Sequence, residues 1–153
     1  MKLKSLRFET LAEGHLPQVL ALEQRSHLSP WSEASFRMEL GHPAGIFLVA
    51  ILGGEIVGYG GCWVLVDEAH VTNVVVAEEH RREGIGLRLM KELLHRAVER
   101  GAICATLEVR AGNTAAATLY EGMGFVSAGL RKRYYPDKED AVIMWLHDLA
   151  PYA

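Results

Sequence analysis

The segment from Val74 to Arg110 constrains the fold most strongly, because an amphipathic helix separates two apolar strands there. Three consecutive valines end the first strand, and "AICATLEVR", residues 102–110, contains the second. Between them, residues 84–100 place apolar side chains on one helical face, and Gly101 follows as a natural C-terminal cap. Strands joined by a crossover helix run parallel in one sheet. The fold is therefore expected to contain at least one parallel crossover.

The remaining segments favour antiparallel strands. Gly53-Gly54 and Asp67-Glu68 predict turns that divide residues 45–76 into three strands. A last pair of strands surrounds a turn at Pro136-Asp137. Periodicity and capping residues predict further elements, namely a short strand over 5–9 and helices over 13–26, after Ser32 and after Asn113. We expect an α/β fold of the α+β type with a mixed, mostly antiparallel sheet.

Length and composition narrow the class of protein. The 153 residues, half of them hydrophobic and 23% charged, predict a single globular domain over residues 1–153. The formal net charge of -3 argues against a direct nucleic-acid partner, for which a basic domain is expected. The longest mostly apolar run, residues 44–54, is roughly half as long as a bilayer span. We expect neither a nucleic acid nor a membrane as a partner.

The N-terminal segment and the cysteines bear on localisation. Residues 1–10 have no apolar core of signal-peptide length. Cys62 and Cys104 lie far apart and match no CxxC or zinc spacing, and the histidines form no H-x-x-x-H pair. We expect a cytoplasmic protein with reduced thiols and no metal.

The helix start "RREGIG", residues 81–86, has the composition of an anion site. Free N–H groups, the positive end of the helix dipole and close backbone approach at glycine all suit a phosphate. The stretch is neither a Walker loop nor a dinucleotide fingerprint, because Leu89 stands where the third glycine is needed. On these residues alone, a glycine-softened helix start with surface arginines is an equally good explanation.

In its context this junction resembles the acetyl-CoA site of the GCN5-related N-acetyltransferase (GNAT) superfamily. Members carry Gln/Arg-x-x-Gly-x-Gly/Ala between a strand and a long helix, and Arg81, Gly84 and Gly86 match that pattern. "LEVRAGNTAAATLYEGMGF", residues 107–125, is similar to a bacterial subgroup that acetylates the N-terminal alanine of a small-subunit ribosomal protein. "EQRSHLSPWSE", "DEAHVTN" and "RYYP…EDAVIM" agree with that subgroup, so the resemblance covers nearly the whole chain.

The resemblance implies a GNAT fold, with a central parallel pair of strands splayed at the acetyl-CoA site and helices on both faces. It implies acetyl-CoA as co-substrate, with the pantetheine arm beside Val74, Val75 and Val76, although three valines fit an ordinary buried strand equally well. Asn113, which has the type and position of a helix N-cap, is also expected to contact CoA. The residues implied to hold the pyrophosphate are Arg82, Glu83, Gly84, Ile85, Gly86 and Leu87.

Two side chains are candidates for acid–base catalysis. Glu108 shares a strand face with Thr106 and Arg110 near a strand end, where a carboxylate is a candidate base, although a lone glutamate is more often exposed or ion-paired. Tyr120, about two helical turns after Asn113, is either a core aromatic or an acid. The resemblance implies direct attack by the amine, with Glu108 accepting its proton and Tyr120 acting as general acid towards the CoA thiolate.

The resemblance also implies the acceptor, namely the N-terminal peptide of a ribosomal protein. Trp31, Tyr134 and Tyr135 are candidates for the walls of a peptide slot, although Trp31 serves equally well to pin a loop. Residues 131–133 are either a partner contact or a solvated strand edge. Two other functions stay open: acetylation of a small-molecule amine or a protein lysine, and a non-catalytic acyl-CoA-binding sensor. The presence of both Glu108 and Tyr120 argues against the sensor.

Overall fold

The computed structural model describes residues 5–27 and 29–153, so residues 1–4 of the N-terminal segment and Leu28 of "EQRSHLSPWSE" lie outside the described residues. A seven-stranded sheet has the order β1-β2-β3-β4-β5-β7-β6. Its strands are β1 (Arg7–Thr10), β2 (Gly45–Leu52), β3 (Glu55–Leu65), β4 (Glu68–Val76), β5 (Cys104–Arg110), β6 (Val126–Arg131) and β7 (Ala141–Leu146). All neighbours pair antiparallel except β4 and β5, which are parallel, and this confirms the predicted mixed sheet with its crossover.

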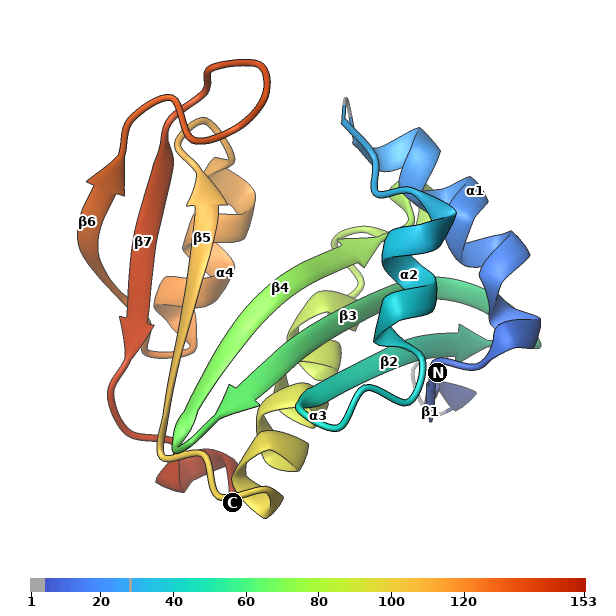
Figure 1. Ribbon diagram of the computed structural model, residues 1–153, viewed down its shortest axis with the longest axis horizontal. Coiled ribbons are helices and arrows are strands. Elements are labelled where there is room, and N and C mark those ends of the chain that lie inside the picture. Colours follow the sequence, from blue (N-terminus) through green and yellow to red (C-terminus); the bar gives the residue numbers. More distant parts are fainter. Residues whose placement is uncertain (1–4, 28) are drawn as a thin grey trace.

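Helices cover both faces of the sheet, as predicted (Figure 1). On one face lie α1 (Leu16–Ser26) and α2 (Glu33–Glu39), and on the other lie α3 (Ile85–Glu99) and α4 (Thr114–Gly122). Short 3-10 turns are η2 (Glu13–His15), η3 (Glu78–His80) and η4 (Ala150–Tyr152). The crossover from β4 to β5 runs through α3, whose buried face carries Leu89 and Leu93.

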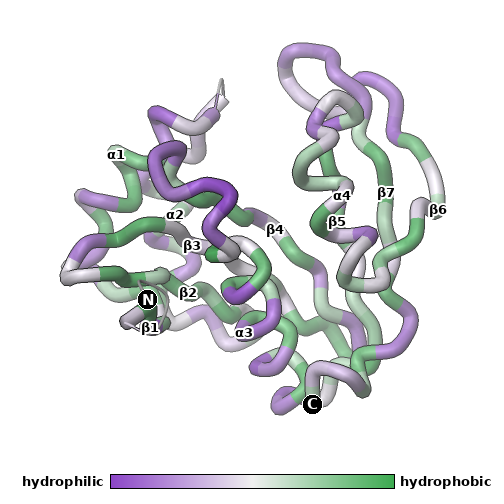
Figure 2. The backbone as a smooth tube through the Cα atoms, turned by 180° about the vertical axis from the view of Figure 1, so that it is seen from behind, coloured by the Kyte–Doolittle hydropathy of each residue, from purple (hydrophilic) through white to green (hydrophobic). Residues whose placement is uncertain are grey.

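The sheet separates two hydrophobic cores. Val19 and Phe36 from α1 and α2 pack with Val75 of β4 on one side. Leu89 of α3 packs with Leu107 of β5 and with α4 on the other. Figure 2 shows the hydrophobic strands between these layers and a hydrophilic loop joining β6 to β7. Because successive strand residues point to opposite faces, each residue of β4 and β5 is assigned to one side of the sheet.

Most predicted boundaries agree with the structure within a few residues, and the largest exception is the β6–β7 loop. The Gly53-Gly54 turn has positive φ at both residues, 60° and 79°, as a tight hairpin requires. The β3–β4 turn falls on residues 66–67, one residue earlier than predicted. The last two strands are shorter than expected, because residues 132–140 form a loop. Arg110 holds that loop through hydrogen bonds from Nη1 to the carboxylates of Asp137 and Glu139.

The parallel pair opens along its length. Only three register pairs join β4 to β5, from Glu68↔Cys104 to His70↔Thr106. Beyond His70, β4 remains paired with β3 and β5 remains paired with β7, but the facing edges of β4 and β5 are no longer paired with each other. Thr72 is an extra residue in the β3–β4 ladder, and such a bulge bends its strand. The strands diverge visibly (Figure 1), which confirms the predicted splay.

Candidate active site

The start of α3 contains a row of backbone amides that have no hydrogen-bond acceptor in the described part of the chain. Gly84, the N-cap, has φ 87°, and Arg82 has φ 65°, so the chain turns sharply before the helix. Within the described residues, none of the amides of residues 82–87 donates to a backbone carbonyl. The first to do so is the amide of Arg88, which donates to the oxygen of Gly84 at 3.2 Å. Clustered free amides at a helix N-terminus are a site for an anion.

Gly86 lies where three elements converge. A Cβ atom on Gly86 would be 3.6 Å from Val76 Cγ2 at the end of β4 and 3.5 Å from Leu119 Cδ2 on α4. The side chain of Arg81 fixes this corner, because its Nε donates to the carbonyl of Val76 at 3.2 Å. The helix start and the end of β4 are therefore adjacent, so a single extended ligand can contact both.

The last residues of β4 line the opening between the strands. Val74 and Val76 are partly buried on the α3 side, while Val75 is buried in the opposite core. The edge of β4 that faces β5 beyond His70 lacks a strand partner, so a ligand with amide groups fits it as a strand would. The three valines thus end a strand before the helix, as predicted from the sequence, and their contact with a coenzyme stays a prediction.

Asn113 is the N-cap of α4, as predicted. Its Oδ1 accepts from the amide of Ala116 at 3.1 Å, which satisfies one free donor of the first turn. The side chain is on an exposed residue, and its second predicted role, contact with CoA, stays a prediction.

Glu108 lies on β5 beyond the last parallel pair. Leu107 and Val109 belong to the α3–α4 core, so Glu108 points to the face that carries α1 and α2. Its side chain is 31% exposed, with Arg131 Nε 3.9 Å from Oε1. The hydroxyl of Tyr134, in the β6–β7 loop, donates to Oε2 at 3.1 Å. The carboxylate is therefore oriented by protein groups and still reaches water.

Tyr120 lies on α4 in the opposite core and is 8% exposed. No group in the described part of the chain hydrogen-bonds its hydroxyl, and no buried side-chain oxygen there lacks a partner, so the hydroxyl must reach solvent. Burial raises the pKa of Tyr120 to about 12, with a smaller contribution from Tyr135. The side chain is thus a buried ring with an accessible, protonated hydroxyl.

The structure does not bring Glu108 and Tyr120 into contact. They occupy opposite faces of β5, and the unpaired edge of that strand lies between them. Tyr135 interacts electrostatically with both groups. It raises the pKa of Tyr120, and Glu108 raises the pKa of Tyr135 after the larger effects of burial and Arg110.

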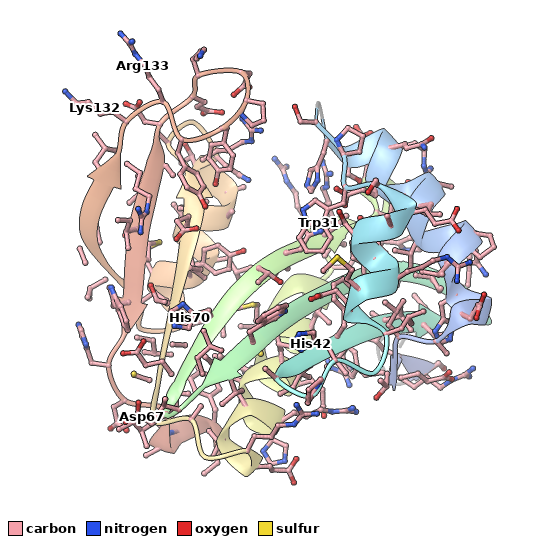
Figure 3. The ribbon with its side chains drawn as sticks, viewed as in Figure 1. Trp31, His42, Asp67, His70, Lys132 and Arg133 are labelled. Atoms are coloured by element: carbon pink, nitrogen blue, oxygen red, sulfur yellow. The ribbon has the colours of Figure 1, made fainter. Side chains whose placement is uncertain are left out.

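Two loops face each other across the opening on the Glu108 side. Trp31, in the α1–α2 loop, packs on Phe36 at 5.2 Å between ring centroids and lies across from the β6–β7 loop (Figure 3). That packing supports the loop-pinning interpretation and leaves its contact with an acceptor untested. In the facing loop the rings of Tyr134 and Tyr135 meet edge to face at 5.1 Å. Lys132 and Arg133 point outward, away from the opening (Figure 3).

Sequence reasoning missed a buried carboxylate beside this site. Glu23 of α1 is 0% exposed and accepts a hydrogen bond from the Asn73 side chain, next to Val74. Its position among the apolar residues of the α1 pattern was a signal, because a charge on the buried face of a helix needs partners.

Other features of the described residues do not compete for the site. No group of three or more His, Cys, Asp or Glu side chains in residues 5–27 and 29–153 is arranged to hold a metal ion. Over the same residues, no helix is long and apolar enough to cross a membrane. A cavity of about 430 Å³ near Glu39 and Arg100 contains none of the predicted site residues.

Comparison with known proteins gives consistent matches. Residues 16–125 match the model of the acetyltransferase (GNAT) family. The ribosomal protein bS18-alanine N-acetyltransferase of Escherichia coli K12 is 38% identical over 140 residues, which are 90% of this chain and 94% of that protein. The crystal structure of the ribosomal-protein-S18-alanine N-acetyltransferase from Escherichia coli has a TM-score of 0.85 at 36% identity, covering 92% of each chain.

A more distant structure shares the fold alone. It is a GNAT family acetyltransferase from Elizabethkingia anophelis with acetyl-CoA bound, which is 18% identical, covers 94% of this chain and 98% of that one, and has a TM-score of 0.78.

Proposed function

This chain belongs to the acetyltransferase (GNAT) family and is an N-acetyltransferase, and we propose that it acetylates the N-terminal alanine of ribosomal protein bS18 in the cytoplasm. The observation that carries the proposal is the 38% identity, over 90% of the chain, to an enzyme named for that reaction. The donor is acetyl-CoA, which the family uses, and the acceptor is the α-amine of an extended peptide.

The splay supports the donor half of the proposal. The pyrophosphate of acetyl-CoA binds the free amides of residues 82–87, and the pantetheine arm lies along Val74, Val75 and Val76. Asn113 contacts the coenzyme from the start of α4. This arrangement places the thioester in the opening between β4 and β5, within reach of Tyr120.

The acid and the base act from opposite sides of the opening. An α-amine has a pKa of about 7.7–8.0 and attacks only when neutral, so its proton must leave. Glu108 accepts that proton, directly or through a water molecule, and the amine attacks the acetyl carbonyl. A backbone N–H of β4 stabilises the oxyanion, and the hydroxyl of Tyr120 donates to the departing sulfur. The acetyl group passes from sulfur to nitrogen without a covalent enzyme intermediate.

The α1–α2 and β6–β7 loops form the acceptor slot. Trp31 lines one wall, and Tyr134 and Tyr135 line the other, with Glu108 at the inner end. The hydroxyl of Tyr134 orients Glu108, and the peptide α-amine enters beside this carboxylate. A slot between two loops suits a chain end better than a side chain in the middle of a folded protein.

An acceptor panel tests the proposal. With acetyl-CoA, we expect turnover of a peptide that begins with alanine, and none of spermidine or of the same peptide with a blocked α-amine and an internal lysine. Glu108→Gln should lower kcat for the alanine peptide by roughly 10²–10⁴-fold. Turnover of spermidine or lysine without turnover of the alanine peptide would contradict the proposed acceptor, and an unchanged kcat in Glu108→Gln would remove Glu108 from the mechanism.

A further inference from the structure

A carboxylate that the reaction does not use lies inside the core on the α1–α2 side. Glu23 is in the third turn of α1 and is 0% exposed, among Val19, Leu22 and Phe36. A charge that is taken out of water costs several kcal/mol unless partners replace the lost hydration. Glu23 therefore either has a full set of partners or is a weak point of the fold.

Four donors from different parts of the chain surround this carboxylate. The hydroxyl of Tyr59, on β3, and the side-chain amide of Asn73, on β4, donate to Oε1 at 2.5 and 3.3 Å. The backbone amide of Trp31 donates to Oε2 at 2.9 Å, and Nδ1 of His27 lies 2.8 Å from the same oxygen. Both carboxylate oxygens are thus satisfied, each by two donors.

These contacts keep Glu23 ionised. Burial on its own raises the pKa of a carboxyl group, but the hydrogen bonds from His27, Tyr59 and the Trp31 amide outweigh it, and the pKa of Glu23 lies below its ordinary value of 4.5. A neutral side chain of the same length has fewer acceptor sites and satisfies fewer of the four donors.

The Glu23 carboxylate accepts hydrogen bonds from two parts of the proposed site. Asn73 is between the bulge at Thr72 and Val74, where β4 has already left β5. The amide of Trp31 belongs to the α1–α2 loop, which forms one wall of the opening (Figure 3). Glu23 is the side chain that hydrogen-bonds to both, so it fixes the position of the loop relative to the edge of β4.

We propose that Glu23 is a positioning residue for the acceptor: it holds the Trp31 loop against β4 so that the slot has its peptide-binding width. The inference rests on the proposed function and extends it, because Glu23 touches neither substrate nor the acetyl group. Among the described residues, none of the hydrogen bonds of Glu23 involves residues 82–87, so the pyrophosphate end of acetyl-CoA should bind independently of Glu23 and the affinity for the coenzyme should change little.

The test compares two substitutions at Glu23. Glu23→Met keeps the length of the side chain and fills the core, but accepts none of the four hydrogen bonds. We expect the KM for the alanine peptide to rise roughly tenfold or more, the effect of one lost hydrogen bond to a charged group, while the Kd for acetyl-CoA stays within about twofold. Glu23→Gln retains one acceptor oxygen and should give an intermediate KM. Glu33→Gln, an exposed carboxylate on α2 paired with Arg37, is the matched control and should behave as wild type.

Hydrogen exchange provides a readout that does not depend on activity. In Glu23→Met the segment 27–36 should exchange faster than in wild type, while α3 should be unchanged. If wild type acetylates another amine, the proposed function fails but the inference is still tested, with that amine in place of the peptide. A folded Glu23→Met variant with wild-type KM and exchange, or one that loses acetyl-CoA affinity to the same extent, would overturn the inference. If Glu23→Met does not fold, a wild-type KM and wild-type exchange in Glu23→Gln would do so.

Discussion

At the scale of single residues, the two proposed catalytic groups have contrasting environments. Tyr120 is buried, and its pKa is raised to about 12, whereas Glu108 is 31% exposed and is held by Tyr134 and Arg131. The raised pKa keeps the Tyr120 hydroxyl protonated at neutral pH. A thiol has an ordinary pKa of about 8.5, so Tyr120 is a much weaker acid than free CoA. We therefore propose that its hydroxyl acts chiefly by hydrogen bonding to the sulfur as negative charge develops there.

The raised pKa of Tyr120 predicts a pH profile. Because the hydroxyl stays protonated below about pH 12, its ionisation should not limit kcat anywhere between pH 6 and 10. Tyr120→Phe should lower kcat by roughly 10²-fold at every pH in that range and leave the shape of the profile unchanged. Steady-state rates against pH check this. A wild-type alkaline limb near pH 9 that disappears in Tyr120→Phe would show that Tyr120 titrates in the working range and would refute this role.

The sequence predicted residues whose roles are local. Ser32 and Asn113 accept hydrogen bonds from the amides of Ser35 and Ala116, as capping rules require. Glu23 could not be assigned in the same way, because its donors on β3 and β4 are 36 and 50 residues away in the chain. Its placement on the apolar face indicated that partners were needed but not which residues supply them.

At the scale of elements, the proposed phosphate site depends on the conformation of the start of α3. Gly84 has φ 87°, a conformation that a β-branched residue adopts only with strain. Gly84→Val should therefore weaken acetyl-CoA binding by at least roughly tenfold, because the amides of residues 82–87 lose their common orientation. Isothermal titration calorimetry with acetyl-CoA measures the change.

Gly101 offers the matched control at the other end of the same helix. Its φ is 96°, and no atom lies within 4 Å of a Cβ placed there, so Gly101→Val introduces similar strain away from the site. Both variants should lose stability, but Gly101→Val should bind acetyl-CoA as wild type does. Equal affinity in all three proteins would contradict the phosphate role of Gly84.

Helix ends and hairpin turns were predictable because they depend on neighbouring residues, whereas the β6–β7 loop was not. The two strands were predicted over residues 125–136 and 140–149, around a turn at Pro136-Asp137, whereas the structure has a loop over residues 132–140. Arg110 of β5 instead binds Asp137 and Glu139, and it lies 4.1 Å from the centre of the Tyr135 ring. Arg110 is 27 and 29 residues away from these two carboxylates in the chain, and a contact across such a separation leaves no local sequence pattern. The loop that carries Tyr134 therefore had to be seen in the structure.

At the scale of the whole molecule, the splay leaves the facing edges of β4 and β5 unpaired at the boundary between the two faces of the sheet. Register between β4 and β5 ends at His70↔Thr106, and the helix start and Tyr120 lie on one face while Glu108 and the two loops lie on the other. Three valines in a strand did not predict this opening, which came from the resemblance to the family. In this account the donor enters from the α3–α4 face and the acceptor from the α1–α2 face, so both meet at the edge of β5.

The proposed mechanism is tested most directly by a crystal structure with a ligand in which an acetyl bridge joins the CoA sulfur to the α-amine of an alanine peptide. We expect the pyrophosphate at the amides of residues 82–87, the pantetheine along Val74–Val76, the sulfur within hydrogen-bonding distance of Tyr120, and the peptide between Trp31 and Tyr134. A ligand bound outside the β4–β5 opening, or one that leaves both Glu108 and Tyr120 distant from the joined sulfur and nitrogen, would contradict it.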